Sequence, residues 1–194
     1  MPTQFQEKKF VILGLVGISD KQIEQHLALY SGYVKNTNKL LEEIASLRGK
    51  EGQNTLALSE LTRRLGFEFN GMRLHELYFE QLTASDYAGS ENLKGALTGQ
   101  FGSFDAWTAD FKQIAMMRGI GWALLMRDKL SGNLHNIWVS DHENGHLAGA
   151  DVIIALDIWE HAFTVDYLPT ERAKYIEAFF QNMKWGVAEN RYAI

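Results

Sequence analysis

The sequence predicts an α+β fold, in which a long antiparallel helical hairpin is followed by a C-terminal domain with a three-stranded antiparallel sheet and helices. In the N-terminal half, apolar residues recur at helical spacing over two long stretches separated by a glycine-containing segment. In the C-terminal half, short apolar runs are bounded by turn residues, as in strands. We therefore expect an N-terminal domain over residues 1–84 and a C-terminal domain over residues 85–194.

The first long helix is expected to begin at Ser19. Residues 19–22 have the pattern of a capping box, in which a Ser side chain and a Gln three residues later satisfy free backbone amides. Gly49 and Gly52 are expected to end this helix. A second helix is expected over residues 56–82, with an interruption at residues 70–71 as one alternative.

The second half is expected to contain a helix after Ser103 and strands near residues 121–126, 134–139 and 152–159. A Ser-Gly-Asn turn joins the first two strands and predicts a hairpin. The third run is apolar on both faces, which is typical of a central strand. Pro169 is expected to open one final helix, because proline is tolerated in a first turn.

The composition fits a folded protein with a substantial core, since 46% of the 194 residues are hydrophobic. A net charge of −5 argues against nucleic-acid binding, which needs a surplus of basic residues to neutralise phosphates. An anionic substrate would therefore need a local basic patch to attract it. The chain has no cysteine, which excludes disulfides, thiolate ligands and iron–sulfur clusters.

An apolar run over residues 10–17 superficially resembles a short signal peptide. No small-residue cleavage site follows it, and the run is far too short to span a bilayer. We expect an ordered arm packed on the protein and no membrane attachment, with a signal peptide as the minor alternative. The lack of cysteine is compatible with a reducing cytoplasm, which is the expected location.

Asp157 is the strongest anomaly in the sequence, because a carboxylate inside an apolar strand is costly unless it is paired or bound to a metal. His161 follows four residues later, so a strand end that turns into a helix places both side chains in one pocket. His26 and His75 fall on the inward stripes of the two N-terminal helices, where a lone histidine is more often part of the core. Together the four residues favour a mononuclear site between the two domains, and they suit Fe, Mn or Zn better than Ca or Mg.

The segment from residue 157 to 167 reads DIWEHAFTVDY, which resembles the D-x-W-E-H-A-Y-Y-x-x-Y signature of the iron/manganese superoxide dismutases. Other segments resemble further motifs of that family in the family's order. They are His26 with residues 33–38, residues 69–70 with 75–79, residues 119–122, and residues 184–192. The similarity therefore extends far beyond one short motif.

The resemblance implies one Fe or Mn ion per subunit, held by His26, His75, Asp157 and His161 with solvent as the fifth ligand. It also implies disproportionation of superoxide to oxygen and hydrogen peroxide in a homodimer, with a tetramer of two dimers as an alternative.

The same resemblance implies roles for residues around the ion. The residues expected at the catalytic pocket are His142, Tyr33 and Tyr30. Those expected to wall the pocket, attract the anion or form the interface are Trp122, Trp159, Glu160 and Arg172. Of these, Glu160 pairs in the family with the ligand histidine of the partner subunit, whereas core packing explains the two tryptophans equally well.

Several positions depart from the family pattern. Tyr30 stands where the family has a second histidine, and Thr164 where it has the tyrosine that meets that histidine across the dimer. Gly71 and residues 141–143 stand at the two usual origins of a glutamine that hydrogen-bonds to the metal-bound solvent. Gly71 is expected to leave room for His142 to take this role, which would add a pH dependence near neutrality. The alternatives are a helix kink at Gly71 and an exposed loop histidine at His142.

Two alternatives to a superoxide dismutase remain open. A catalytically inactive, superoxide-dismutase-like structural protein is disfavoured, because all four ligand residues are present. A metalloenzyme with related oxygen or peroxide chemistry is motivated by the changes at Tyr30 and Thr164.

Overall fold

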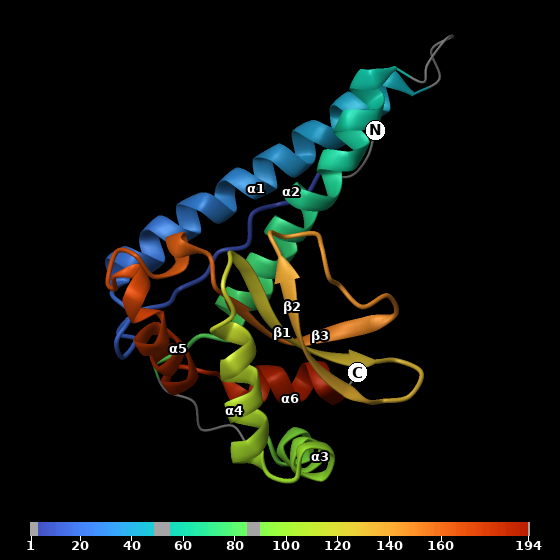
Figure 1. The fold of residues 1–194 in the computed structure, drawn as a ribbon. Coiled ribbons are helices and arrows are strands. Elements are labelled where there is room, and N and C mark those ends of the chain that lie inside the picture. The colour runs from blue at the N-terminus through green and yellow to red at the C-terminus, as the bar shows by residue number, and fades with distance from the viewer. Residues whose placement is uncertain (1–3, 49–54, 85–89, 194) are drawn as a thin grey trace.

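The computed structural model describes residues 4–48, 55–84 and 90–193. Its N-terminal half is a pair of long helices, α1 (Asp20–Leu47) and α2 (Leu56–Glu80), which lie side by side and run in opposite directions (Figure 1). The predicted helical hairpin is therefore confirmed. The expected terminators Gly49 and Gly52 lie outside the described residues.

The start of α1 departs from the expected capping box. Ser19 caps the helix, and its hydroxyl accepts a hydrogen bond from the Gln22 backbone N–H at 3.1 Å. The Ser19 backbone N–H donates to the carboxylate of Asp166 at 2.7 Å, so the Gln22 side chain does not satisfy it. The Gln22 amide therefore makes its contacts elsewhere.

The helix α2 runs through residues 70–71 without interruption. Gly71 is required by packing, because a Cβ there would lie 2.6 Å from the ring of Tyr33 on α1. The space directly beside Gly71 is taken by the Tyr33 ring, and His142 in turn is hydrogen-bonded to the Tyr33 hydroxyl.

The C-terminal half is built on an antiparallel sheet of β1 (Gly121–Asp128), β2 (Leu134–Ser140) and β3 (Ala150–Asp157), in the order β2-β1-β3. The α+β class and the hairpin of the first two strands are confirmed. The central position predicted for the third strand is wrong, because β3 lies at an edge. Contacts with α2 and with α6 (Trp185–Ala193) cover β3, which explains why it is apolar on both faces.

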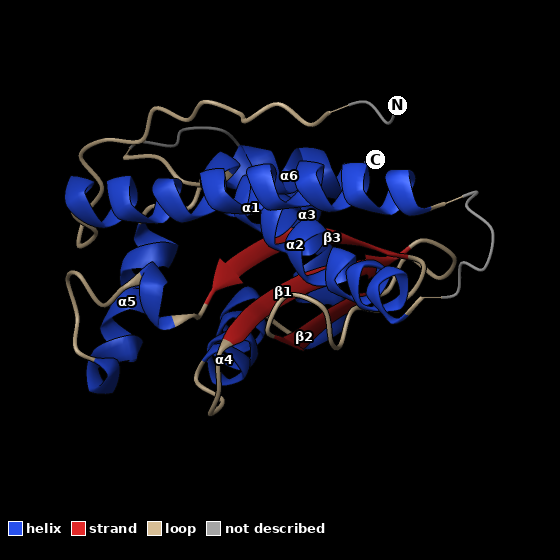
Figure 2. Ribbon diagram, turned by 90° about the horizontal axis from the view of Figure 1, so that it is seen from above, coloured by secondary structure: helices blue, strands red, loops and turns tan. Residues whose placement is uncertain are grey.

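Helices surround this sheet (Figure 2). The elements outside the sheet are α3 (Glu91–Phe101) and α4 (Phe104–Ala115) before it, and η1 (Glu160–Ala162), η2 (Pro169–Glu171), α5 (Arg172–Gln181) and α6 after it. The sequence predicts α4 but not α3. It also predicts one final helix after Pro169, whereas the structure has two α-helices there, α5 and α6, separated by residues 182–184.

The segment before α1 is an ordered arm, as predicted. It forms no helix or strand, yet Ile12, Leu15 and Ile18 are buried in the main hydrophobic core. In the part of the chain that the structure describes, no helix has both the length and the apolar character needed to cross a membrane.

Candidate metal centre

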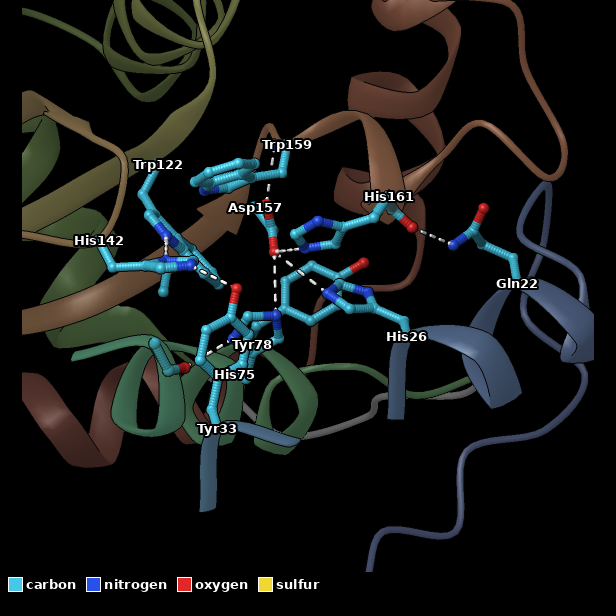
Figure 3. A network of polar contacts seen from close by, with 12 residues as sticks. Gln22, His26, Tyr33, His75, Tyr78, Trp122, His142, Asp157, Trp159 and His161 are labelled. Carbon is cyan, nitrogen blue, oxygen red and sulfur yellow. Dashed lines mark hydrogen bonds and ion pairs between the residues drawn. The ribbon is translucent and has the colours of Figure 1, made fainter. Parts of the chain in front are cut away.

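Four side chains from four different elements meet between the two halves of the chain (Figure 3). His26 comes from α1, His75 from α2, Asp157 from the end of β3 and His161 from η1. Each offers one nitrogen or oxygen atom, and these atoms all lie within 4.8 Å of one another. The structure thus brings together the four residues that the sequence predicts as ligands.

One carboxylate oxygen, Asp157 Oδ2, is the common neighbour in this cluster. It lies 3.1 Å from Nε2 of His26, 3.5 Å from Nε2 of His75 and 3.3 Å from Nε2 of His161. The side chains of His26, His75 and Asp157 are fully buried, whereas that of His161 keeps 21% of its surface exposed. The cluster is therefore closed except beside His161.

The position of the proton on His75 leaves the lone pair of its Nε2 atom without a hydrogen-bond donor in this closed cluster. His75 Nδ1 lies 2.6 Å from the carbonyl oxygen of Gly71, which can only accept, so Nδ1 carries the proton. The Nε2 lone pair then faces the Asp157 carboxylate and has no hydrogen-bond partner. Facing lone pairs in a buried pocket are costly, and a cation between them would turn this repulsion into attraction.

The protonation states in the cluster also suit a metal ion. Burial lowers the pKa of His75 well below its ordinary value, and it lowers the pKa of His26 despite the opposing hydrogen bond to Asp157. Burial would raise the pKa of Asp157, but the facing His161 and His26 rings hold it well below its usual range. Neutral imidazoles and an ionised carboxylate are the metal-binding forms, so these residues fit iron or manganese.

The other oxygen atoms of Asp157 fix the position of its side chain. Asp157 Oδ1 accepts from the Trp159 backbone N–H at 2.8 Å, and the Asp157 carbonyl oxygen accepts from the Tyr175 hydroxyl at 2.8 Å. The Tyr175 hydroxyl also lies 3.1 Å from that of Tyr78, whose ring centroid is 5.0 Å from that of His26. These contacts leave Oδ2 directed at the histidines.

His142 is buried beside the cluster and is not an exposed loop histidine. Its Nδ1 accepts a hydrogen bond from the Trp122 indole N–H at 2.9 Å, because an indole can only donate. The neutral ring therefore carries its proton on Nε2, which lies 2.7 Å from the Tyr33 hydroxyl oxygen. Burial lowers the pKa of His142 to about 4, so the titration expected near neutrality is wrong for this group.

Two tryptophans wall the cluster. The Trp122 ring meets His75 edge to face, with ring centroids 5.1 Å apart. The Trp159 ring is stacked on His161 at 5.5 Å and on His142 at 5.0 Å. Their contacts are with the site itself and not only with the apolar core.

Tyr30 is committed to a different contact. Its hydroxyl accepts a hydrogen bond from the Lys8 backbone N–H at 2.9 Å and donates to the Glu76 carboxylate at 3.1 Å. Tyr30 is fully buried, and burial raises its pKa to about 12. The structure therefore places its polar atom between the arm and α2.

Arg172 and Glu160 come from the segment that follows β3. The Arg172 guanidinium donates to the backbone carbonyls of Met116, Met117 and Gly119, so it anchors the turn that leads into β1. Glu160 is exposed at the start of η1, next to His161 in the chain.

Sequence reasoning missed Phe67 and Tyr175. The Phe67 ring lies 4.6 Å from that of His142 and 6.2 Å from that of Tyr33. Helical spacing is a signal that identifies it, because Phe67 precedes His75 by two steps of four residues and shares its face of α2. Tyr175 has no comparable signal, since its partner is a backbone carbonyl far away in the sequence.

The fold and the cluster define a class: an α+β protein with a candidate mononuclear centre of three imidazoles and one carboxylate. Residues 89–191 match the family model described as iron/manganese superoxide dismutases, C-terminal domain. The chain is also 39% identical over 184 residues to an iron superoxide dismutase of Aquifex pyrophilus, covering 92% of this chain and 85% of that protein.

Other relatives carry the name of either metal. An iron superoxide dismutase of Cupriavidus metallidurans is 36% identical, with 92% of this chain and 90% of the relative covered. A manganese superoxide dismutase of Haloferax volcanii is 35% identical, with 86% and 82% covered. This chain belongs to the iron/manganese superoxide dismutase family.

Proposed function

We propose that this chain is a superoxide dismutase, which converts two superoxide ions to oxygen and hydrogen peroxide with one iron or manganese ion per subunit. The observation that carries the proposal is the unpartnered Nε2 lone pair of His75, which faces an ionised Asp157 inside a closed cluster. Relatives named as iron and as manganese enzymes support either metal. The ligands would be His26, His75, Asp157 and His161.

When bound, iron or manganese supplies reversible one-electron chemistry, by which an electron taken from one superoxide ion is returned to a second. Forming hydrogen peroxide also consumes two protons, so the protein must hold protons close to the ion. The His142 Nε2–H donates to the Tyr33 oxygen, which leaves the Tyr33 O–H free to donate into the site. Burial raises the pKa of Tyr33, so the phenol stays protonated at neutral pH.

A pocket beside Tyr33 offers a path for the anion. It has a volume of about 360 Å³, and Trp159, Phe67 and Arg64 are among its lining residues. The Arg64 guanidinium lies 3.8 Å above the Phe67 ring and pairs with Glu68 at 2.8 Å. Glu68 lines the same pocket and offsets this charge, so Arg64 gives the opening a hydrogen-bond donor for an anion but no net positive charge.

We further infer a homodimer that joins through the Glu160–His161 region. The support is that His161 alone among the four candidate ligands has a partly exposed side chain, with Glu160 exposed beside it. A second copy would close this opening. A cytoplasmic location stays our expectation.

The deciding experiment measures superoxide decay with purified protein loaded with iron or manganese and assayed for metal content. We expect activity with at least one metal. His75→Ala should lose both metal and activity, whereas the control His135→Ala, at an exposed histidine on β2, should keep both.

Other outcomes would contradict the proposal. Tight metal binding without superoxide decay would favour related oxygen or peroxide chemistry. A wild-type protein that binds neither metal would favour an inactive, structural role. Full metal content and activity in His75→Ala would refute the ligand set.

A further inference from the structure

The candidate ligands are divided between the two halves of the chain, so their convergence depends on how these halves are joined. His26 and His75 stand on α1 and α2, whereas Asp157 and His161 belong to β3 and η1. Two buried glutamines, Gln22 and Gln81, connect these elements, and neither has a part in the chemistry proposed above.

Gln22 joins α1 to the segment that carries His161. Its Nε2 donates to the backbone carbonyl of His161 at 2.7 Å (Figure 3), and its Oε1 accepts from the backbone N–H of Val165 at 3.0 Å. The side chain is 1% exposed. Gln22 precedes His26 by four residues, so one face of α1 both bears a candidate ligand and holds the loop of another.

Gln81 joins the end of α2 to the strand that carries Asp157. Its Nε2 donates to the Ala155 carbonyl, and its Oε1 accepts from the Ala155 N–H at 3.2 Å. The strand β3 is an edge strand, so Ala155 has no neighbouring strand on this side. The glutamine amide thus satisfies backbone groups that a further strand would otherwise pair.

We propose that Gln22 and Gln81 are positioning residues of the metal centre, which dock the two ligand-bearing segments of the C-terminal half onto the two ligand-bearing helices. This inference rests on the ligand set proposed above. Each side-chain amide pairs with one N–H and one C=O of a buried backbone segment. Replacing the glutamine by an apolar residue leaves these two backbone groups unpaired, and burying them without a partner costs free energy. The segment then shifts to regain partners, and its metal ligand shifts with it.

The test compares Gln22→Met, which keeps the side-chain volume but loses both hydrogen bonds, with a matched control, Asn182→Leu. The Asn182 amide makes a similar pair of bonds to Val16, with its N–H and C=O each at 2.8 Å, donates also to the Ala178 carbonyl at 2.7 Å, and is equally buried. Val16 lies in the N-terminal arm, which carries no candidate ligand. Both changes therefore remove a buried amide that binds a distant backbone segment, and Asn182→Leu removes one hydrogen bond more. Only Gln22 binds a segment that carries a candidate ligand.

The measurements use Co²⁺ as the probe: its visible spectrum reports coordination geometry, and its transfer to a chelator reports the dissociation rate. We expect both variants to lower the thermal unfolding temperature. Only Gln22→Met should alter the spectrum and speed Co²⁺ loss, by about tenfold or more, which is the scale for groups that orient metal ligands. Gln81→Met should act in the same direction.

The outcomes separate this inference from the proposed function. A Gln22→Met protein with the wild-type spectrum and Co²⁺ release rate would overturn the positioning role, as would an equal acceleration in Asn182→Leu. Should Gln22→Met fail to fold, Gln22→Glu keeps the acceptor for Val165, removes the donor to His161 and carries the same expectation. A wild-type protein that takes up no Co²⁺ would instead refute the ligand set itself.

Discussion

Tyr33 takes part in three contacts at once, and Gly71 makes them compatible. The phenol ring packs against the bare Cα of Gly71, stacks on His75 at 5.0 Å and receives the His142 hydrogen bond at 2.7 Å. The ring therefore has little freedom to move. The absence of a side chain at Gly71 of α2 therefore allows the position of the Tyr33 hydroxyl, the proton donor on α1.

Gly71→Ala should therefore destabilise the protein by about 1–3 kcal/mol, as overpacking of a core does. It should also lower activity, because the added Cβ would displace the Tyr33 ring. The matched control is Gly95→Ala in α3, where a Cβ meets nothing within 4 Å and should stabilise the helix by about 0.5–1 kcal/mol. Denaturant unfolding measures both changes, and equal effects at the two sites would contradict this account.

His142→Gln should keep metal content but change the ratio of activity with iron to activity with manganese. His142 holds the Tyr33 hydroxyl, whose O–H is the donor free to face the site, so replacing the imidazole by an amide changes how that donor is oriented and with it the redox potential. The control His146→Gln alters a neighbouring histidine whose Nε2 is hydrogen-bonded to the backbone carbonyl of His142 at 3.0 Å. Assays with each metal check the prediction, which an unchanged ratio in His142→Gln would refute.

At the scale of elements, the sequence predicts features that show as a helical period of apolar residues or as a polar group whose burial costs free energy. The hairpin helices and the candidate ligands are of this kind, because a buried carboxylate such as Asp157 is conspicuous in an apolar strand. The edge position of β3 could not be predicted, since cover by helices and cover by strands leave the same apolar pattern. The Gln22 contacts could not be predicted either, because its position also suits a capping box.

One carboxylate, that of Glu80, binds both the arm and the C-terminal helix to α2. Glu80 ends α2, and it accepts from Lys8 of the arm at 2.7 Å and from Arg191 of α6 at 3.1 Å. Burial would raise the pKa of Glu80, but the hydrogen bonds from Lys8 and Arg191 outweigh it and lower the pKa below 4.5. Ionised Glu80 therefore stabilises the folded state.

Glu80→Gln should be less stable than the wild type at neutral pH. A lowered folded-state pKa contributes stability that is fully present above the unfolded value of 4.5 and is lost as the pH falls through the folded value. The difference in unfolding temperature between the metal-free proteins should therefore shrink as the pH falls below 4.5. Glu177→Gln, which breaks the more exposed pair with Lys112, is the control and should change little at any pH.

At the scale of the whole molecule, the candidate centre is not sealed by its own chain. The surface opening at His161, with Glu160 beside it, faces outward, while Tyr30 is turned into the arm and cannot bridge two subunits through its hydroxyl. Any dimer must therefore rely on other contacts than the histidine–tyrosine pair of the family.

We expect light scattering to give a dimer at micromolar concentration. Glu160→Ala should weaken it, because a two-fold interface uses the same residue from both subunits and loses each contact twice. Glu91→Ala, at a glutamate that is also exposed but lies on α3, should leave the dimer intact. A monomeric wild type would contradict the inferred assembly.

The order of the candidate ligands along the chain has a consequence for biosynthesis. His26 and Asp157 are 131 residues apart, and the helices that carry His26 and His75 are synthesised long before β3 and η1. The hairpin can pair while translation continues, because its contacts are close in sequence. It then offers only two imidazoles to any passing ion. The complete set of candidate ligands exists only once His161 has left the ribosome, so binding of an ion by all four residues has to follow the synthesis of β3 and η1.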